Sequence, residues 1–321
     1  MKNVAITGVS GYLGTLLAKR ILQEPEVEHL IGMDIKEPDI QSPKFTFIKH
    51  DVRQPFGNIL SENKIDTAIH FAFIVAPIHA EAMAHEINIK GSQNFMAAAA
   101  EAKVEQVFYM GSYSAYGAWR DNPTFTEDMP LKPNPDFPYP SDKAEVDHMF
   151  QKFATEHPDI KVTIGRTAAV TGPGGAKCGL TVLFLPVMIK PIGLDSTWQF
   201  IHEDDLVDII TLLAKQRKAG IFNFTAQGAY KYSEIIKMLG KPSISLPSWL
   251  LYWGIKITWR LKLQSKAQAG ALRMIQYSTL MSGEKLIKET GYKYRYTGPE
   301  AFDIFLEVMG KKKPASCSCQ E

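Results

Sequence analysis

The chain has little of what marks secreted, membrane-spanning or nucleic-acid-binding proteins. Its 321 residues include only three cysteines, Cys178, Cys317 and Cys319, which are too few for a disulfide framework and fit a reducing compartment. No apolar run reaches the roughly 18 residues of a membrane-spanning helix, and the first predicted strand begins at Lys2, too early for a signal peptide. The 36 basic and 34 acidic residues nearly cancel, so nothing favours nucleic-acid binding. We therefore expect a cytoplasmic globular protein without a nucleic-acid partner.

Metal-ligand patterns are also missing. The histidines show no paired spacing with carboxylates or thiols, and the Cys-x-Cys of the basic C-terminal tail supplies only two thiols. Two thiols alone do not complete a structural zinc site, so we expect no metal. The tail, residues 311–321, is predicted to be disordered.

What the chain does contain is a regular alternation of strands and helices in its first half. Short β-branched or aromatic runs predict strands over residues 4–7, 29–34, 45–49, 66–71, 106–111 and 161–167. Helical segments are predicted between several of them, over residues 12–22, 81–102 and 141–156. Apolar strands with intervening helices indicate a parallel sheet covered on both faces. The predicted class is therefore α/β, with a doubly wound parallel sheet of the Rossmann type.

The stretch TGVSGYLG, residues 7–14, lies between the first strand and the first helix. In this context Gly8 permits the tight turn, Gly11 lets the backbone approach a pyrophosphate, and Gly14 lets helix and strand pack closely. The phosphates would lie at the helix N-terminus, where Ser10, Tyr12 and Leu13 supply backbone or hydroxyl donors. Asp34 ends the second strand, where its carboxylate can accept both ribose hydroxyls and would repel a 2′-phosphate. The predicted cofactor is therefore NAD rather than NADP.

After Gly172 the pattern loosens into shorter elements. We predict a strand over residues 198–201, a helix over 204–214 that Asp204 or Asp205 caps, and a strand over 221–224. An NAD-binding domain is predicted over residues 1–172, with 195–225 returning to it. The segments 173–194 and 226–310 are predicted to form a small C-terminal substrate lobe.

Tyr139 and Lys143 lie four residues apart, so on a helix they share a face. An ammonium beside a phenol stabilises the phenolate, which lets the tyrosine act as an acid or base near neutral pH. The pair follows Ser112 of GSYSAYG, which ends a predicted strand and can bond a substrate oxygen. Ser, Tyr and Lys in this order, after a glycine turn and an acid, indicate a catalytic group of hydride-transfer chemistry.

From Met1 to about Leu213 the chain resembles the extended short-chain dehydrogenases/reductases, the family of NAD-dependent epimerases and dehydratases. TGVSGYLG resembles the family's TGxxGxxG, and GSYSAYG resembles the stretch that carries the catalytic hydroxyl, with Ser114 as second choice to Ser112. The resemblance further assigns cofactor contacts to Asp51, Val52, Phe71, Ala72, Phe73, Thr167 and Ala169, and an active-site-organising role to Asn88.

The resemblance also implies roles and an assembly. Tyr139 would exchange a proton with the substrate, Lys143 would hold the nicotinamide ribose, and Ser112 would orient the substrate oxygen. Similar proteins suggest a homodimer through the helices at 81–102 and 141–156.

The substrate is less well defined by the sequence. In nucleotide-sugar members of the family an asparagine that helps to hold the diphosphate stands where this chain has Ala169, and the following segment, 178–194, is strongly apolar with Lys190 as its single cation. These residues, and a C-terminal pattern that resembles hydroxysteroid-dehydrogenase-like members, favour an apolar, steroid- or lipid-like substrate. A different small alcohol or ketone, and a nucleotide sugar acted on by an epimerase, remain open, as does a non-catalytic dinucleotide sensor. Tyr113 and Ser114 follow Ser112 where a dehydratase would need acids.

The segment 246–263 contains three tryptophans and a tyrosine among leucines and isoleucines, with cations at Lys256, Arg260 and Lys262. Its apolar composition predicts a buried helix in the small lobe. A lipophilic substrate lid or an interfacial helix, and with it a weak contact with a membrane surface, is the alternative.

Overall fold

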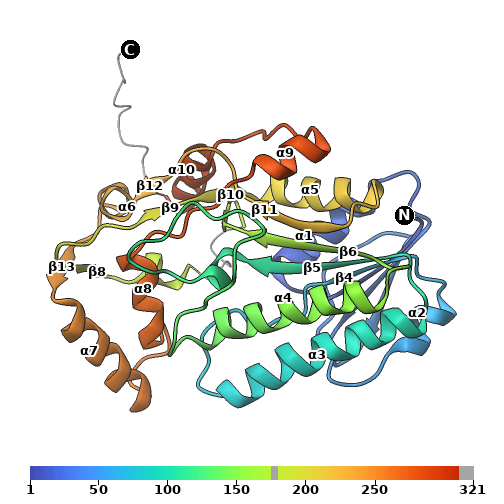
Figure 1. Cartoon of the computed structure of the whole chain (residues 1–321), viewed down its shortest axis with the longest axis horizontal. Helices are drawn as coiled ribbons and strands as arrows, with labels where there is room; N and C mark the ends of the chain where they lie inside the picture. The colour runs from blue at the N-terminus through green and yellow to red at the C-terminus, as the bar shows by residue number, and fades with distance from the viewer. Residues whose placement is uncertain (175–179, 311–321) are drawn as a thin grey trace.

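The computed structural model describes residues 1–174 and 180–310, and its centre is a parallel sheet of seven strands (Figure 1). The strand order is β11-β6-β5-β4-β1-β2-β3, and every neighbouring pair is parallel. The strands are β1 (Asn3–Thr7), β2 (His29–Asp34), β3 (Phe45–Lys49), β4 (Thr67–His70), β5 (Gln106–Ser112), β6 (Lys161–Thr167) and β11 (Gly220–Phe224). The order reverses between β1 and β4, as the predicted doubly wound α/β fold requires.

Helices cover both faces of this sheet, as the near-continuous burial of its central strands demands. On one face α1 (Tyr12–Ile21) lies beside α5 (Glu203–Lys215), and both contribute to one apolar core. On the other face α2 (Gly57–Glu62), α3 (Glu81–Glu101) and α4 (Pro138–Glu156) enclose a second core, and Figure 1 shows α3 and α4 side by side.

The C-terminal part adds a smaller region around a third apolar core. It contains three short strand pairs, β7 (Ala169–Thr171) with β10 (Phe200–His202), β8 (Met188–Pro191) with β13 (Ser243–Leu246), and β9 (Thr197–Trp198) with β12 (Tyr230–Lys231). Its helices are α6 (Tyr232–Leu239), α7 (Ser248–Arg260), α8 (Leu272–Gln276) and α10 (Gly298–Val308). Helix α9 (Glu284–Thr290) returns to the large sheet, where it packs on β11 and adds Leu286 to the first core. The division of the chain into lobes at the predicted boundaries stays a prediction.

Three sequence predictions differ from the structure. The helix expected from residue 141 begins at Pro138, since proline is tolerated in a first turn, so Tyr139 lies inside the helix. The strand expected over 198–201 is split into β9 and β10. The cap of α5 is neither Asp204 nor Asp205: His202 accepts the bond from the Asp204 amide, and Asp205 is buried, where it accepts from the Tyr292 hydroxyl.

The prediction of a buried helix at 246–263 is also wrong. Within α7 only Leu251 is buried, while Trp249, Trp253 and Ile257 are 66%, 52% and 53% exposed. The composition of the segment is apolar on both sides of the helix, and only one side faces the core. No helix among the described residues is long and apolar enough to cross a membrane. All three cysteines, residues 175–179 and the predicted disordered tail lie outside the described residues.

Candidate active site

The glycine turn between β1 and α1 is packed so tightly that side chains are excluded at Gly8 and Gly14. Gly8 has a φ of +73°, and a Cβ there would lie 2.5 Å from the Ala72 amide nitrogen. A Cβ on Gly14 would lie 2.2 Å from the Gly8 carbonyl oxygen. A Cβ on Gly11 would meet only that same oxygen within 4 Å, so Gly11 faces open space. The turn therefore brings backbone close to whatever binds above it.

The N-terminus of α1 fits an anion. Gly11 is its N-cap residue and offers no side-chain oxygen, so the amides of the first turn, which begins at Tyr12 and Leu13, have no side-chain cap. Uncapped amides and the positive end of the helix dipole form a phosphate-binding site. The residues present here thus fit the pyrophosphate of a dinucleotide.

Asp34 ties the end of β2 to this turn. Its Oδ2 accepts the Ser10 amide at 3.0 Å, and its Oδ1 accepts the Ile35 amide at 2.7 Å. A carboxylate has about four acceptor positions, so capacity remains for ribose hydroxyls. The Lys36 carbonyl, two residues after Asp34, accepts from the Ser10 hydroxyl, so this segment lies against the same turn.

Among the other residues expected to contact the cofactor, Phe71 and Ala72 lie against the turn, whereas Asp51 and Val52 have partners of their own. The Phe71 amide donates to the Thr7 carbonyl, and Phe71 and Ala72 abut Gly8. Val52 is buried, and its carbonyl accepts from Asn94. The carboxylate of Asp51 is bonded by the guanidinium of Arg53, which lowers the Asp51 pKa.

The catalytic lysine expected from the sequence is buried at the end of β5. The Lys143 Nζ donates to the Met110 carbonyl at 2.6 Å and lies 3.6 Å from the ring centroid of Phe73. It is 6.0 Å from the ring centroid of Tyr139, whose ring meets that of Phe73 edge-on at 6.0 Å. Lys143, Tyr139 and Phe73 thus form one group, which joins the first turns of α4 to the end of β4.

Burial sets the charge of this lysine. Loss of water around the ammonium lowers the pKa of Lys143 to about 7, against the attraction of Asp147 and Asp142, which raises it. An amine that titrates near neutral pH can change its charge during a reaction. That property is typical of catalytic sites.

Ser112 and the residues expected beside it meet at the carboxyl ends of β5 and β6. The Ser112 Oγ is buried and lies 2.9 Å from the Ser114 Oγ, which brings both candidate hydroxyls together. Thr167 is opposite Ser112 in the sheet register, and Ala169 is buried in β7. Since ligands of doubly wound sheets bind at the carboxyl ends of the strands, this is the expected place for substrate and nicotinamide.

Asn88 belongs to a network that the sequence did not reveal. Its Oδ1 accepts the Ile74 amide at 2.8 Å, and its Nδ2 donates to Asp142 at 2.8 Å. The other oxygen of the buried Asp142 lies 2.7 Å from the Nδ1 of His85, and this contact raises the pKa of His85. Asp142 directly precedes Lys143, but its partners are 54 and 57 residues away, and no pattern links them.

His70 is fully buried behind the site. Its Nδ1 lies 2.7 Å from the Thr7 hydroxyl and its Nε2 3.0 Å from the Ser92 hydroxyl, and its ring stacks on Phe95. Burial, and secondly the charge of Lys143, lower the pKa of His70 to about 3. His70 is therefore a neutral structural residue.

This neutral histidine predicts a pH dependence of folding. Its folded pKa lies below the ordinary value, so below about pH 6.5 the unfolded chain binds the extra proton and stability falls as the pH falls. Between pH 6.5 and 5, we expect the wild type to lose about 2 kcal/mol more unfolding free energy than His70→Phe. Urea unfolding at a series of pH values measures this difference. Parallel pH curves for the two proteins would contradict it.

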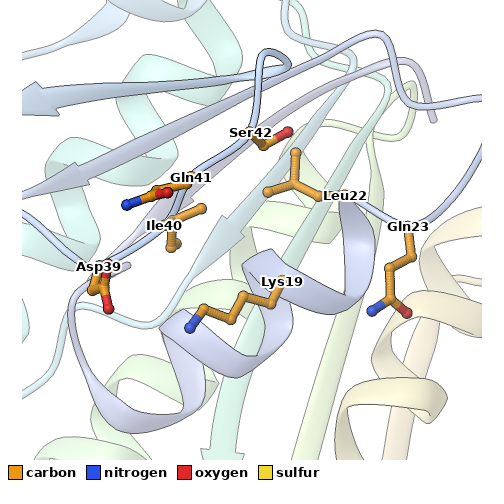
Figure 2. A pocket seen from close by; sticks show the side chains of 7 residues that line it. All are labelled: Lys19, Leu22, Gln23, Asp39, Ile40, Gln41 and Ser42. Atoms are coloured by element: carbon orange, nitrogen blue, oxygen red, sulfur yellow. The ribbon is translucent and has the colours of Figure 1, made fainter.

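The hollows of the surface do not by themselves mark the site. Figure 2 shows an open depression at the C-terminal end of α1, lined by Lys19, Leu22, Gln23, Asp39, Ile40, Gln41 and Ser42, whereas the glycine turn is at the other end of that helix. A smaller cavity is lined by Tyr139 and by the apolar residues Ile74, Val75, Ala76, Pro77 and Ile78, among others. No group of three His, Cys, Asp or Glu side chains in the described residues could hold a metal.

A family model matches the first two thirds of the chain. The model of the "NAD dependent epimerase/dehydratase family" matches residues 4–224, which include the glycine turn, Asp34, Ser112, Tyr139 and Lys143.

Curated relatives cover more of the chain at moderate identity. An uncharacterized protein of Mycobacterium tuberculosis is 27% identical over 318 residues, 96% of this chain and 84% of that protein. The dTDP-D-glucose 4,6-dehydratase of Homo sapiens is 27% identical over 247 residues, 69% of this chain and 68% of that protein.

Solved structures share the fold. A dTDP-glucose 4,6-dehydratase from Bacillus anthracis in complex with NAD has a TM-score of 0.73 at 16% identity, over 97% of both chains. The UDP-glucose 4-epimerase of Thermus thermophilus with NAD has a TM-score of 0.72 at 17% identity, over 96% of this chain and 98% of that one. None of these relatives is named as a hydroxysteroid dehydrogenase, so that part of the predicted resemblance has no support.

Proposed function

The chain belongs to the NAD dependent epimerase/dehydratase family. We propose that it binds NAD and transfers a hydride between NAD and a hydroxyl-bearing carbon of its substrate. The observation that carries the proposal is the group at the end of β5. There Lys143 is buried one helical turn after Tyr139 and beside the strand that ends in Ser112. When bound, NAD supplies the acceptor and donor of the hydride.

The chain's own residues supply binding and proton transfer. Tyr139 takes the proton of the substrate hydroxyl as the carbon loses its hydride and the carbonyl forms, and it returns that proton in the reverse direction. Lys143 stabilises the phenolate and holds the nicotinamide ribose. Ser112 orients the substrate oxygen, and Asn88 fixes the segment at Ile74 and the start of α4 around them.

For the substrate we propose a nucleotide-activated sugar, which reverses the preference for an apolar substrate that the sequence suggested. The similarity to the human dTDP-D-glucose 4,6-dehydratase over 69% of the chain supports a sugar nucleotide. Epimerisation suits this chain better than dehydration, because Tyr113 and Ser114 follow Ser112 where a dehydratase would need acidic residues, and neither side chain has a carboxyl group. Assembly as a homodimer through α3 and α4, and a cytoplasmic location, stay predictions.

A dehydrogenase of a small apolar alcohol is the second candidate. It is favoured by the cavity at Tyr139, whose wall is largely apolar, and by Ala169, which has no side-chain donor for a phosphate.

One incubation series separates the two candidates. The purified full chain, supplied with NAD, is given UDP- and dTDP-hexoses or aliphatic and aromatic secondary alcohols, and sugars and NADH are analysed. A new sugar epimer without net NADH supports the epimerase. NADH that accumulates with an alcohol supports the dehydrogenase, and conversion of neither class would contradict both.

The choice of NAD over NADP depends on Asp34. In Asp34→Ala the carboxylate that would repel a 2′-phosphate is gone, so we expect NADP affinity relative to NAD to rise by about tenfold or more, the equivalent of about 1.4 kcal/mol. Titration of wild type and variant with both dinucleotides measures the ratio. An unchanged ratio, in a variant that unfolds like the wild type, would show that Asp34 does not face the ribose.

A further inference from the structure

The outward face of α7 is apolar and exposed. Trp249, Trp253 and Ile257 follow one another at intervals of four residues, so they form one stripe along the helix. Leu261 and Leu263 continue the exposed surface beyond the helix end. Figure 1 shows α7 as an outlying helix at the end of the molecule away from the large sheet. Contiguous apolar surface of this kind marks an interaction site.

The opposite face of α7 is already bound to the protein. Leu251 is buried, the Trp259 indole donates to Glu81 at 2.9 Å and its ring lies 4.1 Å from that of His79. On the flank of the helix, beside Trp253, Tyr252 and Lys256 both donate to Asp136. The outward stripe is therefore not needed to attach the helix.

The charged residues of the segment that contains α7 are all basic. From residue 241 to residue 283 the chain contains no aspartate or glutamate, and its cations there are Lys241, Lys256, Arg260, Lys262, Lys266 and Arg273. Two carboxylates of the described residues meet α7. Glu81 accepts from Trp259 on the inner side. Asp136, which is 47% exposed, accepts from Lys256, whose Nζ lies 5.6 Å from the ring centroid of Trp253. Arg260 and Lys262 are exposed, and neither forms a salt bridge with any described residue. Exposed tryptophans beside unpaired cations are typical of helices that lie in a bilayer interface.

We propose that α7 docks on the surface of an anionic lipid bilayer. Trp249, Trp253 and Ile257 enter the headgroup and acyl boundary, and Arg260 and Lys262 meet the lipid phosphates. The residues that line the cavity at Tyr139 include Glu81 and Gln268, and Gln268 also donates to Glu81 at 2.8 Å. Glu81 thus accepts from both Trp259 of α7 and Gln268 of the cavity wall, so its carboxylate links the docked helix to the cavity at Tyr139.

A second copy of the chain is a poorer occupant of this face. A two-fold interface places the same patch on both partners, so Arg260 and Lys262, which form no salt bridge with a described residue, would enter one interface twice and gain no carboxylate from the segment 241–283. An anionic bilayer supplies the missing opposite charge.

The test is sedimentation of the full chain with lipid vesicles. We expect binding to phosphatidylcholine vesicles that contain phosphatidylserine, weaker binding to pure phosphatidylcholine, and a decline with added salt. Arg260→Gln with Lys262→Gln should weaken binding by roughly twenty-five-fold, since each cation near an anionic surface contributes about fivefold. Trp249→Ser with Trp253→Ser should weaken it by about tenfold or more.

Two controls keep the result specific. Val308→Ser changes an equally exposed apolar residue on α10 and should leave vesicle binding unchanged. Replacement of Lys311, Lys312 and Lys313 by glutamine tests the basic tail. The proposal is overturned if the chain does not bind anionic vesicles, or if only the tail variant loses binding. It is also overturned if light scattering shows that the wild type is a dimer and the tryptophan variant a monomer.

Discussion

Tyr139→Phe is expected to lower turnover by about 100- to 10,000-fold, the usual contribution of a positioned acid or base, while NAD affinity stays within about twofold. The variant keeps the ring that meets Phe73 and removes only the hydroxyl that exchanges the proton. Turnover is measured with the substrate class that the incubation series identifies, and NAD affinity by titration calorimetry.

A matched variant separates this effect from a general loss of a tyrosine hydroxyl. Tyr230→Phe removes a hydroxyl that bonds Asp303 in the C-terminal region, so turnover should be unchanged. If Tyr139→Phe lost NAD binding together with activity, Tyr139 would be a structural residue of the cofactor site, and the proton-transfer role would be wrong.

Asp147→Ala is expected to lower the unfolding free energy by about 3 to 5 kcal/mol, because it leaves the guanidinium of Arg166 buried without its counter-ion. Arg166 Nε and Nη2 donate to the two carboxylate oxygens of Asp147 at 2.9 Å each, and both side chains are almost completely buried. The remaining partners of Arg166, the Tyr116 hydroxyl and the Glu127 carbonyl, carry no full charge. Urea unfolding measures the loss.

An ion pair on the same helix is the control. Lys152 and Glu156 are both exposed, so Glu156→Gln should change stability by no more than about 1 kcal/mol. The double change Asp147→Ala with Arg166→Met should recover part of the lost stability, since no unpaired charge is then buried. Equal, small effects of Asp147→Ala and Glu156→Gln would show that the buried pair does not hold α4 to β6.

The strands were predictable because each is a short β-branched or aromatic run, and all but the edge strand β3 are largely buried. Residues 29–34, 45–49 and 161–167 form strands with those very bounds, and the glycine turn lies where its spacing placed it. Helix α4 begins three residues before the predicted bound, because its first turn has no need of the amides that Pro138 and Pro140 lack.

What the sequence could not supply is contact between distant residues. The link from His85 through Asp142 to Asn88 joins α3 to α4, and no local pattern encodes it. The contact between the Lys143 ammonium and the Phe73 ring also joins residues that are far apart in the sequence. The exposure of α7 was missed for a different reason, because composition reports how apolar a helix is and not which of its faces the rest of the chain covers.

The most direct test of hydride transfer between substrate and NAD, with Tyr139 as the acid or base, is the isotope content of the cofactor. The full chain is given NAD and substrates that carry deuterium on the hydroxyl-bearing carbon, either a sugar nucleotide or a secondary alcohol, and the quenched nicotinamide is analysed by mass spectrometry. We predict deuterium on the cofactor with the wild type, and labelling that is at least about 100-fold slower with Tyr139→Phe. Bound NAD that acquires no deuterium from either class would contradict the proposal and leave a dinucleotide-binding protein without redox catalysis.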